Sequence, residues 1–73
     1  MIITPPSASS TAAEVRAALA RLDMTQTELA AVTGRSQGYW SKRLSGRIAL
    51  NVTDLALISR LTGVSIADLT RAA

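Results

Sequence analysis

The chain has 73 residues, which is enough for one domain but not for two. Because it contains no cysteine and no histidine, disulfides, thiolate or imidazole metal sites and most nucleophile–base pairs are excluded, and we expect no enzyme, no metal and no cofactor. The net charge is +3 at pH 7, and no apolar run reaches the roughly eighteen residues of a membrane span, so we expect a cytoplasmic protein.

Residues 1–10 contain two adjacent prolines and three serines, a composition that disfavours a helix. We expect a flexible N-terminal arm over 1–10, followed by a single domain over 11–73. No lysine or arginine precedes Arg16, so the arm is not a basic one. Its apolar residues Met1, Ile2 and Ile3 leave open whether it is disordered, folds back on the domain or meets another chain.

A first helix is predicted over residues 11–22. Thr11 and Glu14 have the spacing of a capping box, in which each side chain bonds to the backbone N–H of the other. The apolar residues that follow at helical spacing are Val15, Ala18, Leu19 and Leu22. Arg16 and Arg21 lie off this apolar stripe and are expected to face solvent.

The next helix starts at Thr25, where Thr25 and Glu28 form a second capping box. Met24 stands just before this cap, in the position of a hydrophobic staple. Gly34 ends the helix, because glycine adopts the left-handed conformation of a helix end most easily.

A third helix is predicted from a Ser36 cap to a glycine terminator at Gly46. Two short helices joined by a glycine turn are the signature of a helix-turn-helix. Trp40 and Leu44 are four residues apart and share the face that packs on the domain. The residues expected on the outer face are Gln37, Gly38, Ser41 and Lys42. Such residues meet base edges in the major groove, where glutamine pairs with adenine and lysine donates to guanine.

The remaining chain predicts two more helices. Residues 47–50 form a loop pinned by Ile48 or Leu50, and Asn51 then caps a helix over about 52–62 that ends at Gly63. Asp54 lies in the first turn, where its charge complements the helix dipole. A last helix is predicted over 65–72. The expected fold is therefore all-α with five helices.

The charge is distributed unevenly. The stretch from residue 35 to residue 50 has no acidic residue and four basic ones, namely Arg35, Lys42, Arg43 and Arg47. A solvated basic face is one interpretation; phosphate contact is favoured because these charges coincide with the predicted reading helix.

The stretch TQTELAAVTGRSQGYWSKRLSG, residues 25–46, resembles the Cro and phage-repressor family of helix-turn-helix proteins, also called the xenobiotic-response-element family. The resemblance covers about residues 11–70. The family's tail pattern is matched by Leu55, Ile58, Gly63, Val64 and Leu69. It implies a compact, lambda-repressor-like fold and sequence-specific binding of double-stranded DNA, with the helix at about 36–45 in the major groove.

The resemblance also assigns roles to single residues. It assigns base reading to Gln37, Gly38, Ser41 and Lys42. It assigns contact with the DNA backbone to Thr25, Gln26, Tyr39, Ser45, Arg47 and Asn51. In family members a glutamine at the position of Gln26 braces the first glutamine of the reading helix, here Gln37. The chain departs from the family at Thr62 and Arg43, where large aliphatic residues are common. We expect Arg43 to lay its stem on the core and to reach the phosphate backbone.

The expected function is a transcriptional regulator, a phage or prokaryotic repressor or Cro-like protein, associated with the nucleoid when bound to its operator. We expect a weak or DNA-assisted homodimer on a near-palindromic site, and no small-molecule ligand or membrane partner. The predicted dimer or partner surface comprises Leu57, Leu61, Ile66 and Leu69; packing of Leu57 and Leu61 on the first helix or the arm is the alternative. A protein-interaction module, such as an antitoxin or a subunit of a larger regulator, is the alternative function.

Overall fold

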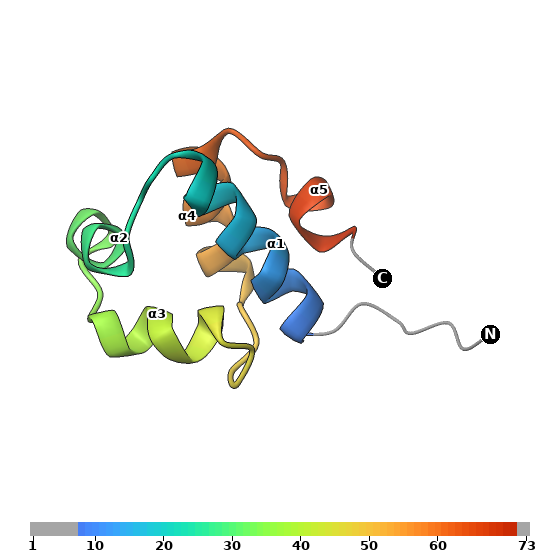
Figure 1. The fold of residues 1–73 in the computed structure, drawn as a ribbon. Coiled ribbons are helices and arrows are strands. Elements are labelled where there is room, and N and C mark those ends of the chain that lie inside the picture. The colour runs from blue at the N-terminus through green and yellow to red at the C-terminus, as the bar shows by residue number, and fades with distance from the viewer. Residues whose placement is uncertain (1–7, 72–73) are drawn as a thin grey trace.

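The computed structural model describes residues 8–71. The helices of this part of the chain are α1 (Ala8–Arg21), α2 (Gln26–Thr33), α3 (Gln37–Leu44), α4 (Val52–Thr62) and α5 (Ile66–Thr70). It contains no strand, so the predicted all-α fold with five helices is confirmed. Helix α1 packs against α3, α4 and α5, whereas α2 packs against α3 (Figure 1). Helix α3 therefore lies at one side of the domain, held by α1 and α2.

The N-terminal caps of α2 to α5 lie where the sequence predicts helix starts, whereas α3 ends at Leu44 with Ser45 as its C-cap, before the predicted terminator Gly46. Thr25 and Asn51 each form a complete capping box, and Ser36 and Ser65 accept from a backbone N–H in the first turn of α3 and α5. Gly34 and Gly63 close α2 and α4 in the left-handed conformation, as expected. Helix α5 is shorter than predicted and ends at Thr70.

Helix α1 starts three residues earlier than the sequence predicts. It begins at Ala8, so residues 8–10, assigned to the N-terminal arm, are helical, and Thr11 lies inside the helix rather than at its cap. The physical reason is that Ala8, Ser9 and Ser10 all tolerate helical geometry, and extending the helix adds backbone hydrogen bonds that a cap at Thr11 would forgo. The rest of the predicted arm, residues 1–7, lies outside the described residues.

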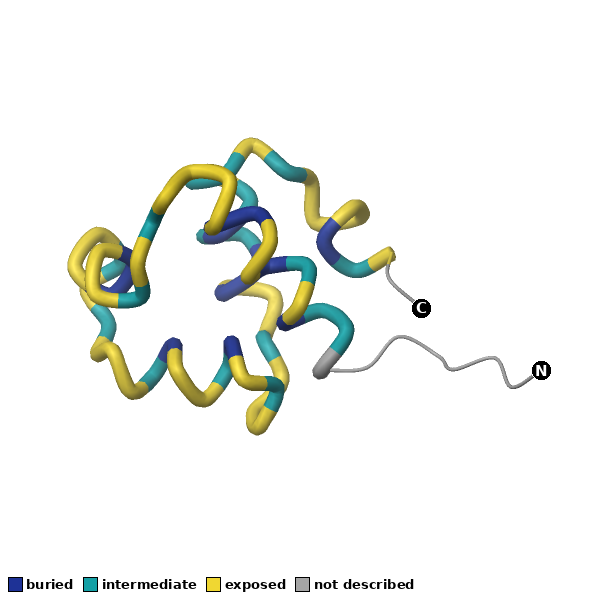
Figure 2. Tube along the Cα trace, viewed as in Figure 1, coloured by how far each residue is buried: buried dark blue, intermediate teal, exposed yellow. Residues whose placement is uncertain are grey.

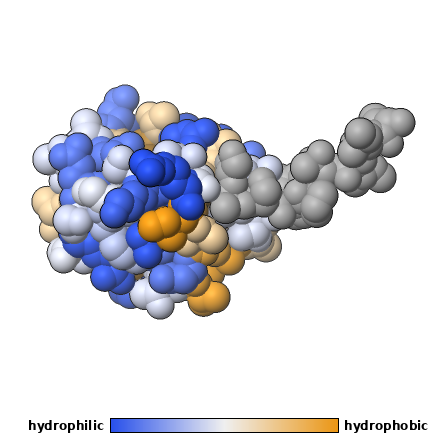
Figure 3. Space-filling view, turned by 90° about the horizontal axis from the view of Figure 1, so that it is seen from below, coloured by the Kyte–Doolittle hydropathy of each residue, from blue (hydrophilic) through white to orange (hydrophobic). Residues whose placement is uncertain are grey.

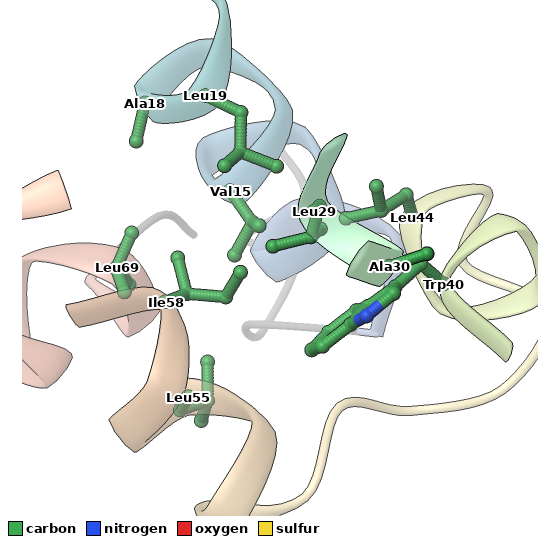
Figure 4. Packing of buried hydrophobic residues seen from close by; sticks show 10 residues of the cluster. All are labelled: Val15, Ala18, Leu19, Leu29, Ala30, Trp40, Leu44, Leu55, Ile58 and Leu69. Carbon is green, nitrogen blue, oxygen red and sulfur yellow. The ribbon is translucent and has the colours of Figure 1, made fainter. Parts of the chain in front are cut away.

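The core is aliphatic except for one indole ring. Its fully buried side chains come from every helix and include Val15, Leu29, Trp40, Ile58 and Leu69 (Figure 4). Met24 and Leu50 are partly buried against this cluster, in agreement with their predicted anchoring roles. Of the two alternatives for the loop, Leu50 is therefore the anchor, and Ile48 is 42% exposed. One expectation is wrong: Leu22, expected on the apolar stripe of the first helix, is 46% exposed. Leu22 follows the last residue of α1, so the helical period no longer sets its direction.

Arg16 is exposed, as the sequence predicts, but it also makes a bond that the sequence does not predict. Its guanidinium Nη1 donates to the carbonyl of Leu44, at the end of α3. A cation at a helix C-terminus is favourable because the last carbonyls lack helical partners and carry the negative end of the dipole. Arg16 thus ties the end of α3 to α1.

Candidate nucleic-acid interface

Helix α3 presents two opposite faces. Trp40 is fully buried and Leu44 is 2% exposed, as predicted. The four proposed base readers, Gln37, Gly38, Ser41 and Lys42, are all exposed. Along α3, buried positions alternate with exposed ones (Figure 2), and seen from below, the side on which α3 lies, the surface is mostly hydrophilic (Figure 3). The inward face is thus fixed by packing, and the outward face is free for a partner.

Trp40 fixes the rotation of α3 about its own axis. Its indole Nε1 donates to Thr33 Oγ1 over 2.9 Å, and Thr33 Oγ1 in turn donates to the carbonyl of Leu29 over 2.7 Å. The only polar atom of a fully buried ring is thereby satisfied by α2. The two helices of the helix-turn-helix are therefore joined by a polar bond as well as by apolar contact.

Gly38 is exposed near the start of α3. A Cβ built there would meet only Ser36 Oγ at 3.9 Å, which is ordinary contact, and its φ is not positive. Neither space nor backbone conformation within the domain requires glycine, although glycine weakens a helix. A bare backbone on the outer face allows another molecule to approach closely.

Five of the residues assigned to DNA-backbone contact lie outside α3, in three places. Thr25 and Gln26 lie at the start of α2, Ser45 and Arg47 follow α3, and Asn51 caps α4. Gln26 is partly buried and lines a cavity of about 150 Å³ with α1 residues and Leu44. Within residues 8–71 no hydrogen bond joins Gln26 to Gln37, so their expected brace stays a prediction. Their contacts with DNA stay a prediction.

A buried carboxylate, Asp54, joins α3 to α4. Asp54 is fully buried, its Oδ1 accepts the Tyr39 hydroxyl, and its Oδ2 accepts Arg43 Nε at 2.9 Å and the Asn51 N–H at 3.1 Å. From the sequence, Asp54 is predicted only to lie in the first turn of α4, where it complements the dipole. The one sequence signal for this contact is Arg43 itself. It stands where the family commonly has an aliphatic residue, and a cation at such a position needs an anionic partner.

This arrangement changes what Arg43 and Tyr39 can offer. Arg43 is ion-paired to Asp54, its side chain is 16% exposed, and its Nη1 donates to the carbonyl of Tyr39 at 3.3 Å. Tyr39 has one hydroxyl proton, and that proton is donated to Asp54. A phosphate is an acceptor only, so Tyr39 must change partner before its hydroxyl donates to DNA. Arg43 has five N–H donors and the bonds above use two of them, so the limit on Arg43 is its ion pair with Asp54 rather than a lack of donors. The carboxylate also raises the pKa of Tyr39 above its usual value, because the hydrogen bond favours the protonated phenol.

Arg35 lies in the turn between α2 and α3, directly after Gly34 and one residue before Ser36, the cap of α3. Its guanidinium carbon lies 4.9 Å from the centre of the Tyr39 ring, and that of Arg43 lies 3.6 Å from the same centre. The Nε atom of Arg35 is buried and has no hydrogen-bond partner. Among residues 8–71 the ion pairs are Arg43 with Asp54 and Arg71 with Asp68, so Arg35 has no carboxylate partner there.

The fold and this surface define a helix-turn-helix domain. No helix among residues 8–71 is long and apolar enough to cross a membrane, and these residues hold no cluster of three acidic side chains suited to a metal. A family model described as helix-turn-helix matches residues 15–69, which is most of the chain. The chain therefore belongs to the Cro/repressor-type helix-turn-helix family, whose members are DNA-binding regulators rather than enzymes. Neither the curated proteins nor the solved structures gave a match.

Proposed function

We propose that this protein is a sequence-specific transcriptional repressor, of the phage or prokaryotic Cro-like kind, that places α3 in the major groove. The observation that carries the proposal is the division of α3 into a buried Trp40 and Leu44 face and an exposed polar face. The stretch from residue 35 to residue 50, which contains α3, has four basic residues and no acidic one. Such a protein works in the cytoplasm, bound to the nucleoid.

On the polar face, Gln37 has the amide geometry that pairs with adenine, and Lys42 donates to guanine. Ser41 and Gly38 complete the face. Phosphate contacts come from the flanking groups: the Thr25 and Gln26 start of α2, Ser45 and Arg47 after α3, and Asn51 at α4. Of these, Arg47 is an exposed cation that lies directly after the reading helix, so it is the best candidate for a purely electrostatic contact.

The test combines selection of sites from a random duplex pool with two substitutions. Gln37→Ala should cost about 1 to 3 kcal/mol on the selected site and relax preference at one base pair. Arg47→Gln should weaken binding to every duplex and reduce the salt slope. Arg60→Gln, on the exposed side of α4, is the matched control for loss of charge. Equal loss on selected and random duplexes for Gln37→Ala would contradict base reading, and salt-independent binding would favour a protein-interaction module.

We further propose that two copies bind a near-palindromic operator, because one such domain covers too few base pairs to find its site in a genome. The predicted dimer surface needs one correction: Leu69 is 1% exposed and belongs to the core. Leu57 and Leu61 are partly buried against that core, so Ile66, at 37% exposed, is the most accessible residue of the predicted set. The apolar area is small, which fits a weak or DNA-assisted dimer.

The dimer is tested with Ile66→Glu. Sedimentation should find that the wild type and Ile66→Glu are both monomeric at low concentration. The wild type should nevertheless bind a duplex with two half-sites cooperatively. Loss of cooperativity in Ile66→Glu, with single half-site affinity retained, supports this surface. Unchanged cooperativity in a folded variant places the dimer contact elsewhere.

A further inference from the structure

Arg35, which stands just before the cap of α3, and two side chains of α3, Tyr39 and Arg43, form one cluster, called here the Tyr39 flank. The two guanidinium groups lie over the same phenol ring. Two cations so close together repel each other unless one is neutralised. Asp54 neutralises one of them, Arg43.

We propose that these two arginines have different functions on DNA: Arg35 supplies the phosphate-facing charge of the flank, whereas Arg43 with Asp54 positions α3. This inference rests on the proposed DNA binding and reassigns the phosphate contact that the sequence predicted for Arg43.

The case for Arg43 as a positioning residue comes from its partners. Its Nε is used by Asp54 on α4 and its Nη1 by the carbonyl of Tyr39 on α3. Asp54 also accepts a hydrogen bond from the Tyr39 hydroxyl, so two side chains of α3 donate to one fully buried carboxylate of α4. Removing Arg43 from this site to reach a phosphate would leave a buried charge unpaired, which is costly. The pair therefore fixes the distance and tilt between the reading helix and α4.

The case for Arg35 comes from its position and its lack of a carboxylate. It precedes Ser36, the cap of α3, and a helix N-terminus attracts anions through its free N–H groups and its dipole. Arg35 is partly buried and stacked on Tyr39, so its guanidinium loses little freedom when it binds a phosphate. Its charge stays available because no carboxylate among residues 8–71 pairs with it.

The experiment measures affinity for the selected duplex across a range of salt concentrations. Arg35→Gln should lower the salt slope by about 0.9 per bound protomer, because one phosphate contact is lost. Arg60→Gln removes the same charge away from α3 and should leave the slope unchanged. The double variant Arg43→Gln with Asp54→Asn keeps the net charge and offers neutral hydrogen-bonding groups. It should lose about tenfold in affinity on the selected site with an unchanged slope.

A lower slope in the Arg43/Asp54 double variant with an unchanged slope in Arg35→Gln would overturn the inference. Unchanged affinity and base preference in that double variant would also overturn the positioning role. If the double variant does not fold by circular dichroism, Arg43→Leu with Asp54→Leu removes the same two charges while keeping apolar packing, and the same criteria apply. A wild-type protein without salt-dependent duplex binding would instead refute the proposed function itself.

Discussion

Replacing Gly38 with alanine should move stability and DNA binding in opposite directions. Gly38 lies in the first turn of α3, its φ is not positive, and a new Cβ would have only Ser36 Oγ nearby, at 3.9 Å. Alanine loses less backbone entropy than glycine on folding, which is worth about 0.5 to 1 kcal/mol in a helix. The lower end applies in a first turn, so we expect a melting temperature about 2 to 4 °C higher.

DNA binding should become weaker, because the added methyl group lies on the face of α3 that is proposed to meet the bases. If base edges approach the bare backbone at Gly38, the methyl group must displace them or tilt the helix. The expected loss is about 1 to 3 kcal/mol, or roughly 5- to 150-fold in Kd. Thermal melting followed by circular dichroism and a duplex-binding isotherm measure the two effects on the same samples.

Gly34→Ala is the matched control. Its surroundings are equally open, but Gly34 has a φ of 70°, so alanine is strained there and the domain should be destabilised by about 1 kcal/mol. A melting temperature that falls in Gly38→Ala would show that the site has no room for a methyl group. Unchanged duplex affinity in that variant would refute a close approach of DNA to this part of α3.

Three other predictions concern the buried side of the site. Asp54→Ala should cost about 3 kcal/mol in urea unfolding, since it leaves Arg43 unpaired and removes a capping box; a loss below about 1 kcal/mol would contradict this. Trp40→Ala should cost roughly 3 to 5 kcal/mol and leave so small a domain largely unfolded; a native circular dichroism spectrum would show that the ring is dispensable. The folded-state pKa of Tyr39 is raised above 10.0, so its contribution to stability is complete below pH 10 and is lost as pH rises through the higher folded value. Tyr39 is the only tyrosine, so phenolate absorbance reads it directly, and Asp54→Asn should lower the titration midpoint; an unchanged midpoint would refute the bond.

Short-range signals were sufficient to predict most of the helix ends of this fold. The caps at Thr25, Ser36 and Asn51 join groups only three residues apart, and Gly34 and Gly63 end their helices through their own conformational freedom. Helical spacing also placed Trp40 and Leu44 on one buried face. The start of α1 was missed because a cap at Thr11 competes locally with a longer helix, and composition alone does not decide between them.

Which distant groups meet depends on how the helices pack. Asp54 bonds Tyr39 fifteen residues away and Arg43 eleven away, and Arg16 donates to a carbonyl twenty-eight residues away. Periodicity tells which residues share a face but not which element covers that face, so Leu69 was predicted at a surface and is buried. Asp54 already has a complete local explanation as a capping residue. Its long-range partners, Tyr39 and Arg43, are met because the first turn of α4 lies beside them in the folded chain.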